Sequence, residues 1–227
     1  MKIFKLLFGM FFFFFLTTNT FSQGSFSTNL GVLIPVSDYA SDDIYDEDSG
    51  GAGTGLGLGL QYLYPITQNG LNLFCGVDLF YNGLKKSVKN DIEDMYNSLL
   101  GISNGEYNFF KMINVPISAG LNYTFKSNEK LSVFGNAGIT YNFYKITDFV
   151  IKAFNETITV ESDLSQQFGF KIGGGLLFND KTSFTINYLG LGKHDLNVSV
   201  SGGGMTEKID SHQKVDMVTI TLGIKFW

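Results

Sequence analysis

Arginine is absent from this sequence, and cysteine, proline and charged residues are scarce. All 16 basic residues of the 227-residue chain are lysines, there is 1 cysteine (Cys75), and 16% of the residues are charged. Soluble proteins average about 25% charged residues, so a normally hydrated surface is hard to build from this composition. Without arginine, bidentate recognition of phosphate is unavailable. A formal net charge of −5 argues against nucleic acid as a partner. The single cysteine excludes an intramolecular disulfide framework and a multi-cysteine zinc site.

The N-terminus has the three parts of a secretory signal peptide. Two lysines precede an unbroken apolar run at 6–16, and a short polar stretch follows it. A positive start, a short apolar segment and small residues before a cleavage point define such peptides. The apolar run is too short for a membrane anchor, which needs about 20 residues. With Thr20 at −3 and Ser22 at −1, we predict removal of residues 1–22 and a mature chain of 23–227.

Apolar and small polar residues alternate through the mature sequence. No segment after the signal peptide offers 18 consecutive apolar residues, so membrane-spanning helices are not expected. Successive side chains of a strand point to opposite faces, so each alternating run predicts a strand with one apolar face. We expect eight strands, at about residues 26–35, 54–64, 71–82, 109–125, 131–144, 168–178, 183–189 and 215–227.

The connections between these strands alternate in length. Short, turn-rich connections join the second strand to the third, the fourth to the fifth, and the sixth to the seventh. The other four connections, 36–53, 83–108, 145–167 and 190–214, are long and polar. This rhythm is that of an antiparallel up-and-down barrel. Outer-membrane barrels have this form, with an even strand number, short periplasmic turns and longer outer loops. We therefore predict an all-β, eight-stranded transmembrane barrel with four long outer loops, three short periplasmic turns and both termini in the periplasm.

The composition of the two strand faces distinguishes a membrane barrel from a soluble one. The apolar face has almost no charge, and the opposite face consists mainly of Gly, Asn, Ser and Thr. Small side chains suit the crowded interior of an eight-stranded barrel. A soluble lipocalin-like barrel, with the apolar face lining a ligand cavity, is the alternative, but its outer face should be rich in lysine and glutamate. The sequence favours the bacterial outer membrane, with apolar side chains facing lipid.

One strand and the C-terminal run carry a family resemblance. Ile113, Pro116 and Tyr123 match an "(I/L)xxPxxxxxxY" strand, and residues 218–226 alternate apolar residues before the terminal Trp227. The mature chain thus resembles small outer-membrane barrels of the OmpX and PorT-like families. The resemblance implies insertion by the barrel-assembly machinery, which reads such C-terminal runs, and it supplies no catalytic residues.

Three charged residues lie on the inward parity of the predicted strands: Asp78, Lys171 and Lys225. Charges in a low-dielectric interior must pair or stay hydrated. Our hypothesis is a polar network in the lumen in which Asp78 and Lys171 pair, joined by Lys225 and asparagines. The alternative is that Asp78 and Lys171 are independently hydrated.

Two other groups of residues could carry chemistry. The first long loop holds Asp38, Asp42, Asp43, Asp46, Glu47 and Asp48, and oxygen ligands of this kind could bind calcium. The order of an EF-hand is missing, so a solvated, mobile loop is expected instead. His194 could be combined with Asp195 and Ser199 or Ser201 as a hydrolytic group. Nothing fixes that geometry, and we expect His194 and His212 to be exposed loop residues.

The long loops also show local patterns. Apolar residues at 92, 95 and 99 predict a short helix within 91–100, and alternation at 157–160 and 197–201 predicts hairpins that extend the barrel. In OmpX-type barrels, protruding strands form an edge that captures proteins by strand addition. We therefore expect a non-enzymatic protein without a cofactor, whose partners are outer-membrane lipid and an extracellular protein bound by the loops. Its role would be surface interaction or envelope support. A narrow solute channel and an accessory barrel of a secretion system are the alternatives.

Overall fold

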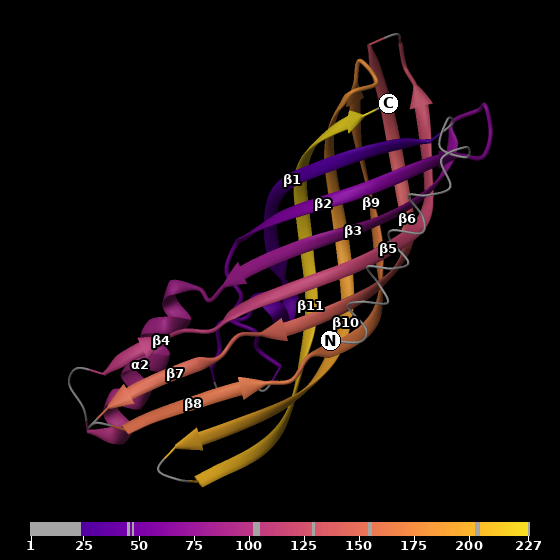
Figure 1. The fold of residues 1–227 in the computed structure, drawn as a ribbon. Coiled ribbons are helices and arrows are strands. Elements are labelled where there is room, and N and C mark those ends of the chain that lie inside the picture. Colours follow the sequence, from indigo (N-terminus) through magenta and orange to yellow (C-terminus); the bar gives the residue numbers. More distant parts are fainter. Residues whose placement is uncertain are drawn as a thin grey trace.

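Eight antiparallel strands close into a ring in the computed structural model (Figure 1). The structure describes residues 24–44, 46, 48–101, 105–128, 130–153, 156–202 and 205–226, so the predicted signal peptide lies outside it. The ring strands are β1 (Ser25–Val36), β2 (Gly55–Pro65), β3 (Leu71–Gly83), β5 (Lys111–Lys126), β6 (Leu131–Ile146), β9 (Ser165–Phe178), β10 (Thr182–Gly202) and β11 (Met205–Phe226). Each pairs with the next, and β11 returns to β1, so the ring has no open edge. The all-β antiparallel architecture matches the sequence prediction.

The connections divide the ring into two ends. The short connections between β2 and β3, between β5 and β6, and between β9 and β10 form what we name the short-turn end. At the opposite, long-loop end, the last connection differs from the prediction, because β10 and β11 continue as a paired hairpin through most of the expected loop at 190–214. Their pairing shifts register between Gly190 and Lys193, and Gly192 has a φ of 96°, which a glycine adopts without strain. The hairpin predicted at 197–201 is therefore present, but it is longer than predicted, because the alternation resumes directly after this bulge.

The apolar strand faces point away from the ring interior. Large exposed side chains surround the ring, with exposures of 65% for Leu56, 66% for Ile139 and 62% for Leu222. We name this band the apolar girdle. Soluble proteins rarely expose continuous apolar areas of this kind. The residues that line the interior cavity are mostly polar, so the lipocalin-like alternative, with apolar side chains around a cavity, does not describe this molecule. No helix among the described residues is long and apolar enough to cross a membrane.

The ring interior has two halves of different character. Toward the short turns it is polar, as predicted. Toward the long loops it is filled by an apolar plug, which contradicts the expectation of a polar lumen throughout. The buried plug comprises Leu33, Tyr39, Ala52, Phe80, Leu84, Val88, Met112, Tyr144, Leu189, Leu191, Leu196, Val215 and Met217. Tyr39, which is fully buried, comes from the 3-10 turn η2 (Ser37–Ala40), which directly follows β1. The plug forms because this turn and the inward apolar residues near the strand ends pack together.

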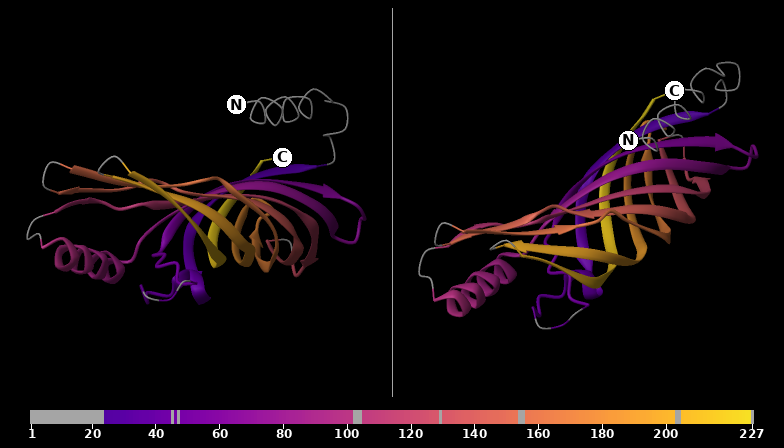
Figure 2. Two further views of the ribbon diagram at one scale, coloured as in Figure 1. Left: turned by 90° about the horizontal axis from the view of Figure 1, so that it is seen from below. Right: turned by 60° about the horizontal axis from the view of Figure 1, so that its bottom comes forward.

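A sheet protrudes from the long-loop end beyond the girdle (Figures 1 and 2). Three short strands, β4 (Glu106–Asn108), β7 (Phe149–Ala153) and β8 (Glu156–Ser162), extend from β10 in the order β10-β8-β7-β4. We name these strands, with the long-loop ends of β10 and β11, the protruding sheet.

One helix, α2 (Lys86–Leu100), lies along the protruding sheet (Figure 2). The Tyr96 and Phe149 rings are 6.1 Å apart, and the Tyr107 hydroxyl donates to Asn97 Oδ1 at 2.7 Å. The predicted helix is present but begins earlier than the sequence indicated, at Lys86 instead of residue 91.

Candidate functional site

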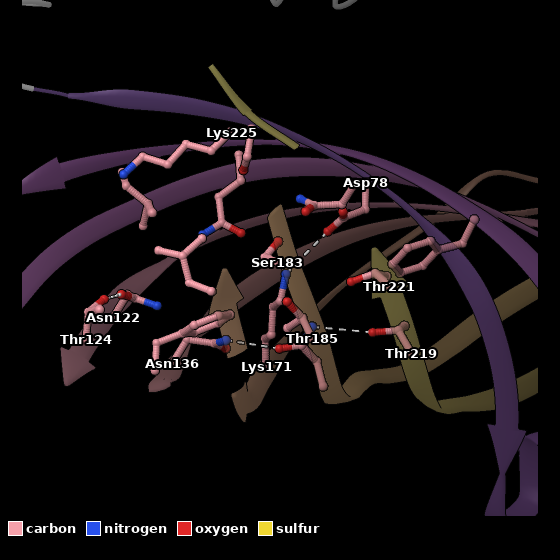
Figure 3. A pocket seen from close by; sticks show the side chains of 18 residues that line it. Asp78, Asn122, Thr124, Asn136, Lys171, Ser183, Thr185, Thr219, Thr221 and Lys225 are labelled. Carbon is pink, nitrogen blue, oxygen red and sulfur yellow. Dashed lines mark hydrogen bonds and ion pairs between the residues drawn. The ribbon is translucent and has the colours of Figure 1, made fainter. Parts of the chain in front are cut away.

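The polar half of the lumen contains an ion pair between two strands that are not neighbours in the ring. Lys171 Nζ of β9 lies 3.6 Å from Asp78 Oδ2 of β3, and the two side chains are 11% and 13% exposed (Figure 3). The same ammonium group is 5.9 Å from the centre of the Phe74 ring. The charges therefore meet inside the barrel, away from bulk water.

Two glycines make room for this pair. Gly59 is directly opposite Asp78, and a Cβ at Gly59 would come within 2.0 Å of the carboxylate. Gly138 is opposite Lys171, and a Cβ there would come within 2.8 Å of the Phe74 ring. The inward glycines that the sequence places on these strands thus allow an aspartate, a lysine and a phenylalanine to fit within an eight-stranded ring.

Amide side chains surround the ion pair. Asn136 Nδ2 donates to Asn187 Oδ1 at 3.1 Å, and Asn187 Nδ2 donates to Thr219 Oγ1 at 3.4 Å. Lys225 lines the same cavity of about 70 Å³, but no ion pair joins it to an acid among the described residues. The structure thus brings Asp78 and Lys171 together, and it places Lys225 beside them in the cavity without a direct charge partner.

A second polar group crosses the plug. Asn114 Nδ2 donates to the Tyr39 hydroxyl at 3.3 Å, and Asn142 Nδ2 donates to Asn114 Oδ1 at 2.8 Å. Asn142 Nδ2 also lies 3.1 Å from His194 Nε2, and His194 Nδ1 lies 3.2 Å from Ser165 Oγ. Buried polar groups of this kind are stable when they bond to one another. This chain joins the η2 turn to β5, β6, β10 and β9.

His194 is fully buried, which contradicts the expectation of an exposed loop histidine. The outward face of β10 changes from Ile186 and Tyr188 to Lys193 and Asp195, so His194 lies beyond the girdle. Burial lowers the pKa of His194 to about 4, so the ring is neutral at physiological pH.

The hydrolytic grouping considered from the sequence is not assembled. Because the side chains of a strand alternate, His194 points inward, whereas Asp195, Ser199 and Ser201 have the opposite parity. The acid and both serines therefore lie on the other face of β10 from the imidazole that they would need.

The serine that does contact His194 is Ser165 of β9, which the sequence did not indicate. Its hydroxyl oxygen lies 3.2 Å from His194 Nδ1, while Nε2 lies 3.1 Å from both the Leu191 carbonyl oxygen and Asn142 Nδ2. Ser165 is 8% exposed and His194 is fully buried, so the hydroxyl is poorly accessible to a substrate carbonyl. A general base needs a reacting group within reach, and the contact is therefore structural.

The acidic loop is attached to the hairpin of β10 and β11. Asp48 Oδ1 lies 3.6 Å from both Lys193 Nζ and His212 Nε2, and Gln213 Nε2 donates to the Asp48 carbonyl at 3.1 Å. Among the described residues, which do not include Glu47, no group of three or more His, Cys, Asp or Glu side chains is placed to hold a metal ion. The calcium hypothesis therefore gains no support from the described part of this loop.

Comparison with solved structures identifies the architecture. The outer-membrane protein OprG of Pseudomonas aeruginosa matches with a TM-score of 0.51 and 15% identity, covering 89% of this chain and 96% of that one. A major outer-membrane protein of Thermus thermophilus matches with a TM-score of 0.52 and 11% identity, covering 89% and 99%. The chain has the fold of small outer-membrane β-barrels. Its sequence matches no protein-family model and no curated protein. The PorT-like resemblance of the β5 strand is not tested by these likenesses.

Proposed function

We propose that this protein is an integral, non-enzymatic barrel of the bacterial outer membrane, with its termini and short turns in the periplasm and the protruding sheet outside the cell. The apolar girdle carries this proposal, because exposed leucine, isoleucine and phenylalanine side chains around a closed ring match lipid and not water. The signal peptide predicted at 1–22 and the C-terminal alternation support export and insertion by the barrel-assembly machinery.

The girdle is tested by placing a lysine in it. We expect Ile139→Lys to lower the free energy of unfolding in lipid vesicles by about 2–4 kcal/mol, because a cation would enter the bilayer. Asn197→Lys is the matched control, since Asn197 lies on the outward face of β10 beyond the girdle, and it should change stability by less than about 0.5 kcal/mol. Equilibrium urea unfolding measures both effects. If the two lysines have equally small effects, the girdle faces water and the proposal is rejected.

The interaction surface that we propose is the free edge of β11 in the protruding sheet. The pairing of β1 with β11 ends at Val36 and Asp216, and beyond this point β11 pairs only with β10 among the described strands. An unpaired strand edge presents backbone N–H and C=O groups to which an extended segment can bind. The apolar plug across the ring interior argues against the alternative role of a solute channel. We therefore place surface interaction through the protruding sheet first.

Photo-crosslinking in intact cells tests this edge. A photoreactive residue at Lys208, on the free edge of β11, should form discrete adducts with another protein, because an added strand would lie within about 5 Å of it. The control position is Lys152 of β7, an exposed residue that pairs with Glu106 of β4 and is separated from β11 by the strands β10 and β8. Adducts at Lys152 alone, or at neither position, would contradict strand addition at β11.

A further inference from the structure

A pocket of about 210 Å³ lies at the long-loop end, between the plug and the protruding sheet. Its floor is formed by Met112 and Tyr144, which are buried in the plug, and its walls include Phe110, Phe149 and Val198. We name it the mouth pocket. It is separate from the polar cavity around Asp78 and Lys171, because the two share no lining residue.

The walls of the mouth pocket are held in place by contacts behind them. Phe149 packs against Phe110 at 6.4 Å and against Tyr96 of α2 at 6.1 Å. On the opposite side, the hydrogen bond from Gln213 to Asp48 holds the segment of Ser49 and Gly50, which also line the pocket. A pocket with walls fixed in this way loses little conformational freedom when a ligand enters.

We propose that the mouth pocket binds a small, neutral aromatic molecule. An apolar cavity of about 150 Å³ is large enough to bind benzene, so the volume of the mouth pocket is sufficient for one substituted ring. Aromatic side chains line it, and offset or edge-to-face contacts with such rings favour an aromatic guest over an open chain.

The charge of the lining selects against anions. Glu161 is the one charged residue among the described residues that line the pocket, and no lysine is among them. The ammonium group of Lys145 is already engaged, because it donates to the carbonyl of the lining residue Ser162. A carboxylate guest would lose its hydration without gaining a cation, whereas a hydroxyl group could bond to the polar rim of Ser211 and Gln213. The inference does not depend on which protein the β11 edge binds.

Methionine methyl groups provide the test. In the mature chain in lipid nanodiscs, the ¹³C-methyl resonance of Met112, assigned with Met112→Leu, is followed during titration with benzyl alcohol. We expect a saturable shift with half-saturation on the order of 1 mM, as suits a ligand of this size. Met95 on α2 does not line the pocket, and its resonance should not show this saturable shift. Equal, non-saturating shifts of Met112 and Met95 would mean partition into lipid and overturn the proposal.

Two further comparisons examine the pocket and the ligand class. Val198→Trp fills the pocket and should abolish the saturable shift, whereas Ser199→Trp, on the opposite face of the same strand, should retain it. If Val198→Trp does not show the gel migration of a folded barrel, Val160→Phe is used in its place, because Val160 also lines the pocket. Benzoate should bind about tenfold more weakly than benzyl alcohol, or worse, and equal binding would reject the selection for a neutral ligand.

Discussion

Replacement of Tyr39 by alanine should lower the free energy of unfolding by about 3–5 kcal/mol. Its side chain is fully buried in the plug, its ring lies 6.4 Å from that of Tyr144, and its hydroxyl accepts a hydrogen bond from Asn114. Truncation leaves a cavity among rigid strand residues and an amide group without its acceptor. The loss should also loosen the first loop, because the buried Tyr39 ring anchors the η2 turn, whose Asp38 and Tyr39 carbonyls accept from Gly50 N–H and Ala52 N–H.

Tyr39→Phe separates the two contributions. This variant keeps the ring and removes only the hydroxyl, so it should cost about 1–2 kcal/mol, the penalty for an unpaired buried amide. Equilibrium urea unfolding in vesicles gives both values, and amide hydrogen exchange of Gly50 and Ala52 reports on the loop. If Tyr39→Ala costs less than about 1 kcal/mol, the long-loop end of the ring is not tightly packed, and the plug does not seal the interior.

The architecture could be predicted because alternation is a local property of the sequence. Residues such as Leu56, Leu58 and Leu60 alternate with glycine, and their parity fixes which face of the strand they occupy. Once the ring closes, that parity decides between the girdle and the interior. The same logic places Asp78 and Lys171 inward. Their contact at 3.6 Å depends on the register of all the intervening strands, which the sequence does not specify.

The plug could not be predicted, because its parts do not share a local pattern. Leu33, Phe80 and Met217 have the inward parity, but they are scattered among glycines and asparagines. Each one alone therefore looks like an isolated apolar residue on a polar strand face. Tyr39 lies in a segment rich in aspartate, which composition describes as a solvated loop. Only the folded ring shows that the η2 turn brings this side chain inward.

The burial of His194 could not be predicted from the sequence for a different reason. The sequence predicted a hairpin at 197–201 but left His194 in a loop, because Gly190 and Gly192 interrupt the alternation just before it. In the structure these glycines mark a bulge, after which the strand continues with shifted parity and places His194 inward. A glycine-flanked break with alternation on both sides is the signal that could have indicated this extension.

Disruption of the lumen ion pair should have an effect as large as that at Tyr39. Asp78→Asn or Lys171→Met alone should each cost about 3 kcal/mol, because either change leaves a mostly buried charge without its partner. The double variant should cost about 2 kcal/mol less than the sum of the two single changes, because it leaves no unpaired charge. The measurement is a double-mutant cycle of unfolding free energies in vesicles.

Lys225→Met provides the matched control for this cycle. Lys225 lines the same cavity but makes no ion pair among the described residues, so its replacement should cost less than about 1 kcal/mol and add independently to Asp78→Asn. Additive effects of Asp78→Asn and Lys171→Met would show that water in the cavity solvates each charge separately. Strong coupling of Lys225 to Asp78 would instead extend the pair to a network of three charges. The coupling energy between Asp78 and Lys171 and that between Asp78 and Lys225 thus show which charges stabilise the polar half of the lumen by pairing. The other half of the ring is closed by the plug.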